Sequence, residues 1–93
     1  MDSNFSGNPE KKGSDQGQSE KRSVLVLHND DINTFDYVME ALEEVCSHTT
    51  IQAEQCAMIT HYNGRCEILN DEFNKLRPVR QQLTDRGLKA TIE

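Results

Sequence analysis

The sequence predicts an α+β fold in which a small three-stranded antiparallel sheet packs against three helices, in the order βααβαβ. Three observations support this fold class. Residues 24–27 are an unbroken apolar run, typical of a strand that is covered on both faces. The segments that follow repeat apolar residues every three or four positions, as amphipathic helices do. Residues 88–92 alternate apolar and polar side chains, as a half-buried strand does.

The first predicted strand covers residues 23–28, and a helix follows almost at once. Asn33 is a suitable N-cap for this helix, and Asp36 resembles the acidic half of a capping box. The apolar stripe of the helix continues to Cys46, and we expect the helix to end near residues 47–48.

The second helix is expected to begin at Thr49, because Thr49 and Gln52 fit the capping-box pattern. Ala53, Ala57 and His61 share one of its faces by spacing. Gly64 follows as a left-handed terminator, which is a common way for a helix to end.

The last third of the chain predicts a short strand at residues 65–69 and a polar turn at 70–72. A loose helical turn comes next, and Pro78 is then expected as the first residue of a regular helix, because proline breaks a helix in its interior. Gly87 ends this helix, and residues 88–93 form the final strand.

The chain has 93 residues, so we expect one folded domain, at residues 23–93. Residues 1–22 contain only two sizeable apolar side chains, and they are therefore predicted to be a flexible N-terminal extension. The extension has four acidic and four basic residues, so the net charge of −6 comes from twelve acidic and six basic residues of the domain.

The acidic balance argues against a nucleic-acid partner, which requires a basic face. The sequence has no apolar run long enough to be a signal peptide or to cross a membrane, so we expect a cytoplasmic protein without a membrane partner. Cys46, Cys56 and Cys66 are odd in number and lack zinc-ligand spacing, so buried free thiols are expected. We predict neither a metal nor a cofactor.

Side-chain oxygens are concentrated in the turn between the first strand and the first helix. Asn29, Asp31, Asn33 and Glu40 occupy positions one, three, five and twelve of an EF-hand register, but Thr34 stands where that loop needs glycine. A cysteine nucleophile is also disfavoured, since no acid orients a histidine beside a thiol. Two interpretations remain open: the turn residues only shape the turn, or some of them bind a cationic group.

The motifs around this turn resemble those of ClpS, the adaptor protein of the Clp protease. They are Val-Leu-His-Asn-Asp-Asp at 26–31, Phe-Asp-Tyr-Val at 35–38, and the segment from Gln55 to His61-Tyr62-Asn63-Gly64. The resemblance covers residues 23–93 and implies a ClpS-like domain without catalytic activity. It also implies that the N-terminal extension is engaged by an unfoldase, whereas its composition alone fits a tail without a specific role equally well.

The resemblance implies binding of proteins that begin with Leu, Phe, Tyr or Trp (N-degrons) and their delivery to an AAA+ unfoldase of the ClpA or ClpC type, which feeds ClpP. By motif, Asn29, Asp30 and His61 would bind the free α-amino group, and Asp31 would border that site. The side-chain pocket would be formed by Ile32, Asn33, Phe35, Val38 and Ala57. We expect the adaptor to be a monomer.

The chain departs from better-known members of the family at several of these positions. Phe35 and Ala57 each stand where many relatives have a methionine. Lys89 stands at a position that is often a pocket leucine, and Thr34 replaces a usual proline. The alternative function is therefore a ClpS-like module that binds the unfoldase and modulates its substrate choice without reading N-degrons.

Overall fold

The computed structural model describes residues 22–93, and it has the predicted order of strands and helices. The elements are β1 (Arg22–His28), α2 (Phe35–Cys46), α3 (Thr50–Asn63), β2 (Arg65–Glu72), α4 (Phe73–Asp85) and β3 (Lys89–Ile92). The sheet has the strand order β2-β1-β3, with both pairs antiparallel. The predicted fold class is confirmed.

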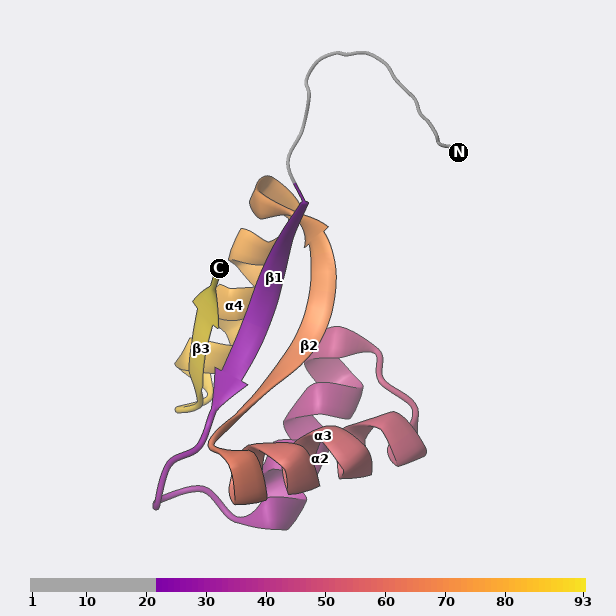
Figure 1. Cartoon of the computed structure of the whole chain (residues 1–93), viewed down its shortest axis with the longest axis vertical. Coiled ribbons are helices and arrows are strands. Elements are labelled where there is room, and N and C mark those ends of the chain that lie inside the picture. The colour runs from indigo at the N-terminus through magenta and orange to yellow at the C-terminus, as the bar shows by residue number, and fades with distance from the viewer. Residues whose placement is uncertain (1–21) are drawn as a thin grey trace.

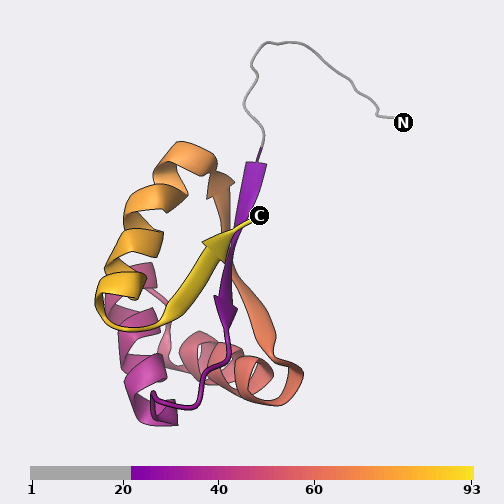
Figure 2. The same cartoon turned by 90° about the vertical axis from the view of Figure 1, so that its left-hand side faces the viewer.

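The helices lie on one face of the sheet (Figures 1 and 2). Helix α4 runs along the sheet, whereas α2 and α3 pack together near the end where β1 finishes. The core forms between these layers, with Leu25, Leu27, Leu42, Leu76 and Leu83 almost fully buried. This packing places the C-terminal end of β1, and the loop from β1 to α2, beside α3.

Helix α3 begins as predicted. The Thr49 hydroxyl accepts a hydrogen bond from the backbone N–H of Gln52 at 3.1 Å, and the Gln52 side chain accepts one from the N–H of Thr49 at 2.9 Å. Gly64 ends the helix with a φ of 92°, a left-handed conformation that glycine adopts without strain. The capping box and the terminator are both confirmed.

The N-cap of α2 is Thr34, so the prediction of Asn33 as the cap is wrong. The Thr34 hydroxyl accepts a hydrogen bond from the N–H of Tyr37 at 3.1 Å. The side chain of Asn33 instead donates to the carbonyl of Gly87 at 2.9 Å, joining the β1–α2 loop to the segment before β3. A contact with a residue 54 positions away has no signature in the local sequence.

Strand β2 continues to Glu72, so the predicted polar turn at 70–72 is wrong. Those residues pair with the start of β1, where Arg22 lies opposite Glu72. The Arg22 side chain donates to the Oδ1 and the carbonyl of Asn70, at 3.2 and 2.9 Å. Arg22, assigned above to the extension, is thus part of the sheet, and the remainder of the predicted extension, residues 1–21, lies outside the described residues.

Helix α4 begins at Phe73, and Pro78 lies inside it rather than at its start, so that prediction is also wrong. A proline there removes one hydrogen bond within the helix, to the carbonyl four residues earlier. Burial of Leu76 and Leu83, one before and one after the proline, holds the helix against the sheet and outweighs this loss. None of the helices in residues 22–93 combines the length and the hydrophobicity that a membrane-spanning helix requires.

Candidate functional site

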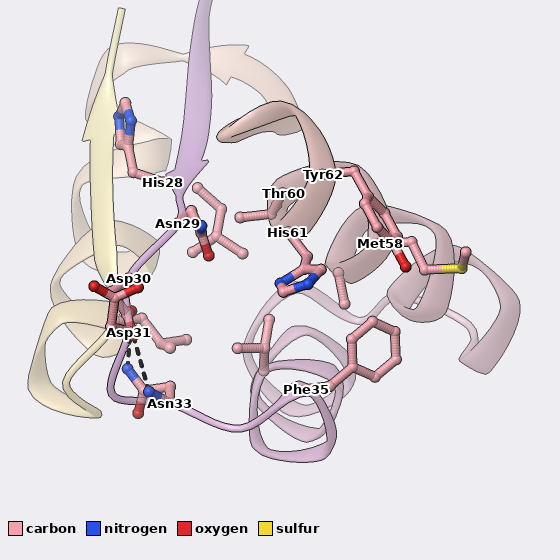
Figure 3. A pocket seen from close by; sticks show the side chains of 14 residues that line it. His28, Asn29, Asp30, Asp31, Asn33, Phe35, Met58, Thr60, His61 and Tyr62 are labelled. Atoms are coloured by element: carbon pink, nitrogen blue, oxygen red, sulfur yellow. Dashed lines mark hydrogen bonds between the residues drawn. The ribbon is translucent and has the colours of Figure 1, made fainter.

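A cavity of about 620 Å³ opens between the end of β1, the loop that leads to α2, and one face of α3. Figure 3 shows Asp30, Asp31 and Asn33 at one side of this space and Phe35 and Met58 at the other. The volume lies in the range of about 300–1,000 Å³ that is typical of small-ligand sites. The cavity therefore has a polar side made by a loop and a less polar side made by helices.

The polar side is organised by the Asp30 carboxylate. Its Oδ1 accepts hydrogen bonds from the backbone N–H groups of Ile32 and Asn33, at 2.9 and 2.8 Å. Its Oδ2 accepts one from the Asn33 side-chain amide at 3.0 Å (Figure 3). Because Asn33 is in turn bonded to Gly87, the loop is held both internally and to the segment before β3.

The charge of Asp30 is set by the same contacts. Partial burial raises the pKa of this carboxyl, but the hydrogen bonds from Asn33 and Ile32, with the positive charge of Lys89, outweigh it. The pKa therefore lies below its ordinary value of 3.8. Asp30 is a carboxylate at neutral pH, and it presents a negative charge at the polar side of the cavity.

Asn29 and His61 point toward each other across the cavity (Figure 3). The backbone N–H of Asn29 donates to the carbonyl of Gly64 at 2.9 Å, which ties the end of β1 to the end of α3. The His61 ring packs edge-on against Tyr62, with centroids 4.9 Å apart. Among residues 22–93 the ring nitrogens of His61 have no hydrogen-bond partner, so they are available to a ligand.

The apolar part of the cavity is formed by residues of β1, α2 and α3 and by the residue just before β3. Leu27, Ala57 and Leu88 are buried there, together with Val38 of α2, which is partly buried. Phe35 is 39% exposed and also lines the cavity. A small side chain at position 57 leaves space where a larger one would fill the cavity.

Eight of the nine predicted site residues line this one cavity, which brings together residues from the loop, α2 and α3. They are Asn29, Asp30, Asp31, Asn33, Phe35, Val38, Ala57 and His61. Ile32 does not line it, and its side chain is 89% exposed. In the turn that Asp30 forms, only the backbone of Ile32 is bonded, and the side chain points into solvent.

Six further residues that the sequence did not predict also line the cavity: Leu27, His28, Met58, Thr60, Tyr62 and Leu88. Met58 and Tyr62 lie four residues apart on α3, beside Ala57 and His61, so helical spacing could have suggested them. Thr60 is buried, and its hydroxyl donates to the carbonyl of Cys56 at 2.7 Å.

Lys89 does not occupy the pocket-leucine position that the resemblance assigned to it, so that prediction is wrong. The leucine of the pocket is Leu88, which is 4% exposed, whereas Lys89 is exposed and does not line the cavity. Lys89 is the first residue of β3, and side chains alternate between the faces of a strand, so the two neighbours point in different directions. A one-residue difference in register decides which of them enters the site.

The cysteines lie outside the cavity. All three are free thiols, with Cys46 and Cys66 buried and Cys56 partly exposed. Burial raises the pKa of Cys46 to about 11 and that of Cys66 to about 12, so both are protonated at neutral pH. Within the described part of the chain, no group of three or more side chains is arranged to hold a metal ion.

The chain is similar to known proteins in both sequence and fold. The family model described as "ATP-dependent Clp protease adaptor protein ClpS" matches residues 18–91. The ClpS adapter protein of Synechococcus elongatus is 34% identical over 73 residues, which are 77% of each chain.

Among solved structures, Agrobacterium tumefaciens ClpS2 bound to L-phenylalaninamide has the same fold, with a TM-score of 0.78 and 22% identity. The match covers 81% of this chain and 98% of that one. Together with the family model and the curated relative, it confirms the resemblance seen in the sequence. The chain therefore belongs to the ClpS family: it is an adaptor of the Clp protease that partners with a Clp unfoldase and its substrates, and it is not an enzyme.

Proposed function

We propose that this adaptor binds proteins whose first residue is large and hydrophobic, and that it delivers them to a Clp AAA+ unfoldase as a cytoplasmic monomer. The observation that carries the proposal is the two-sided cavity, which combines a carboxylate with a buried apolar surface. The relative ClpS2 was solved with L-phenylalaninamide, a ligand that has a free α-amino group and an aromatic side chain.

The polar side suits an α-amino group. Such a group has a pKa near 8, so it is mostly cationic at neutral pH. Asp30 is negatively charged there, while the Asn29 side chain and the His61 ring face the same space. Each charge-assisted hydrogen bond of this kind contributes about 1.5–3 kcal/mol. Only the first residue of a chain carries such an amine, so internal hydrophobic residues would not bind.

The apolar side suits one large side chain. Leu27, Val38, Ala57 and Leu88 surround it, and full burial of a leucine or phenylalanine side chain contributes about 1.5–3 kcal/mol. The cavity of about 620 Å³ has room for this side chain and for the backbone of the first residues. We therefore expect aromatic first residues, including Trp, to be accepted together with Leu.

The test is fluorescence anisotropy with a labelled peptide that begins with Phe, an N-acetylated copy, and a copy that begins with Ala. We expect saturable binding of the first and loss of binding for both others. The acetylated copy keeps the aromatic ring, so equal binding of it would contradict the role of the amino group.

The alternative function is a module that binds the unfoldase and modulates its substrate choice without reading N-degrons. The half-exposed Phe35 at the cavity favours it, because this bulky ring could restrict access to the apolar side. A titration with peptides that carry each possible first residue distinguishes the two functions. Retention of the adaptor by immobilised ClpA or ClpC, measured in parallel, would identify the unfoldase under either one.

A further inference from the structure

A second hollow lies directly beside the cavity, on the β3 side. It is more open than the first, and the two share His28, Asn29 and Leu88. Lys89 lines this hollow and not the cavity. Because Asn29 borders both spaces, a ligand held at Asn29 can extend from one into the other.

Lys89 forms no ion pair with any of the residues that the structure describes. Arg22, Arg65 and Arg86 each form an ion pair with a carboxylate. Lys89 has neither an ion pair nor a side-chain hydrogen bond to any of residues 22–93, and its side chain is exposed. Its positive charge nevertheless reaches the cavity, since it contributes to the low pKa of Asp30.

The position of Lys89 is set by the sheet. It lies opposite His28 in the antiparallel pairing of β1 and β3, so both side chains project from the same face. The Nε2 atom of His28 is within 2.7 Å of the Thr91 hydroxyl, which holds the ring against β3. Lys89 is therefore placed beside the point where β1 ends and the polar loop begins.

We propose that Lys89 and this second hollow form a subsite for an acidic side chain at the second residue of the bound peptide. The inference rests on the proposed function, which places the first residue at Asn29. Consecutive Cα atoms are about 3.8 Å apart, so the second residue is the first one that can reach the neighbouring hollow. A carboxylate there would meet the ammonium group of Lys89.

Other charged groups near the second hollow could weaken the attraction between Lys89 and a substrate carboxylate. Asp30 and Asp31 would repel a second carboxylate, but the bound α-amino group offsets one of these two negative charges. Arg65, the first residue of β2, donates a hydrogen bond to the carboxylate of Glu93 at 2.6 Å and is therefore already paired. Among the described residues that line the cavity or the second hollow, Lys89 is the one lysine or arginine. A substrate carboxylate in the hollow would therefore pair with Lys89.

The test compares three peptides that begin with Phe-Glu, Phe-Gln and Phe-Lys and are otherwise identical. We expect the full-length protein to bind Phe-Glu about two- to fivefold more tightly than Phe-Gln, and Phe-Lys more weakly, as for an exposed ion pair. The preference should shrink in high salt, which screens exposed charges. In the variant Lys89→Glu the order of the peptides should reverse.

The matched control is Lys75→Glu, which makes the same change of charge on α4 at a residue that lines neither space. It should leave the order of the peptides as in the unchanged protein. An identical order in Lys89→Glu and the unchanged protein would overturn the subsite while leaving the proposed function intact. Failure of all three peptides to bind would instead overturn the proposed function, and the subsite with it.

Discussion

The two sides of the cavity are held in different ways. On the loop side, Asp30 accepts three hydrogen bonds from Ile32 and Asn33, and Asn33 is bonded to the carbonyl of Gly87. On the α3 side, Met58 and Tyr62 are 45% and 76% exposed. The His61 ring packs edge-on against the ring of Tyr62. The Asp30 and Asn33 side chains bond to each other, whereas the Met58, His61 and Tyr62 side chains of α3 line the cavity and are exposed.

This difference separates the effects that substitutions should have. The helix backbone of α3 is held by its capping box and by buried Ala53, so its outward side chains can change without disturbing the fold. A change in the loop removes contacts that shape the loop itself. We therefore expect variants of the hydrogen-bonded loop residues Asp30 and Asn33 to lose stability and binding together. Variants of the α3 side chains that face the cavity should lose or change binding alone.

The largest effect is expected for Asp30→Ala. It removes the acceptor of three hydrogen bonds as well as the negative charge of the cavity. We expect the free energy of unfolding to fall by about 1–3 kcal/mol, and binding of a Phe-first peptide to weaken by more than about 100-fold. Urea unfolding and fluorescence anisotropy measure the two quantities.

The matched control is Asp31→Ala, which also removes one acidic side chain from the cavity lining. The Asp31 carboxylate has no hydrogen bond or ion pair within residues 22–93, so stability should change by less than about 0.5 kcal/mol. Equal losses of stability in the two variants would contradict the assigned role of Asp30 in the loop.

The next largest effect is expected for His61→Ala. The ring is exposed and has no hydrogen-bond partner in the described structure, so removing it should change the free energy of unfolding by less than about 0.5 kcal/mol. Binding of the Phe-first peptide should weaken roughly 10- to 100-fold through loss of one bond to the amino group. Unchanged affinity would remove His61 from the site.

A smaller, selective effect is expected for Ala57→Met, which places a long side chain in the cavity. Binding of a Trp-first peptide should weaken about tenfold relative to a Leu-first peptide, because the added atoms occupy space that the larger ring needs, equivalent to about 1.4 kcal/mol. Stability should stay nearly constant, since the side chain extends into a cavity. Anisotropy titrations with both peptides give the ratio.

Ala53→Met is the contrast for this variant, one helical turn earlier. Ala53 is fully buried in the core, so the added side chain should overpack it and lower the free energy of unfolding by about 1–3 kcal/mol. A comparable loss of stability in Ala57→Met would mean that the cavity beside it is not free to accept a side chain.

The smallest effect is a dependence of stability on pH. The folded-state pKa of Asp30 lies below 3.8, so its carboxylate stabilises the fold fully above that pH and less as the pH falls through the folded-state pKa. We expect the stability difference between the unchanged protein and Asp30→Asn to be constant near neutral pH and to shrink below about pH 4. Urea unfolding across this range measures it, and a difference that grows on acidification would have the wrong sign.

Much of the fold could be predicted because its signals are local. The caps of α3 depend on Thr49, Gln52 and Gly64, which lie within a residue or two of the helix ends that they specify. The polar residues after β1 pointed to the loop side of the cavity for the same reason. Helical spacing placed Ala57 and His61 on one face, and both line the cavity.

The remaining features depend on contacts between distant residues. The extension of β2 to Glu72 follows from its pairing with Arg22, and the continuous α4 follows from burial on both sides of Pro78. The bond from Asn33 to Gly87 joins segments 54 residues apart. Such contacts leave no pattern within a short stretch of sequence, so local propensities alone mispredict them.

The sequence by itself determined the family, the order of strands and helices, and the residue types that surround the cavity, because short-range spacing encodes these features. Only the tertiary structure decided that Ile32 points into solvent, that Leu88 lines the cavity, and that Lys89 faces the hollow beside it. The physical reason is that a strand alternates its side chains, so the pairing register of β3 with β1 determines which neighbour is inside.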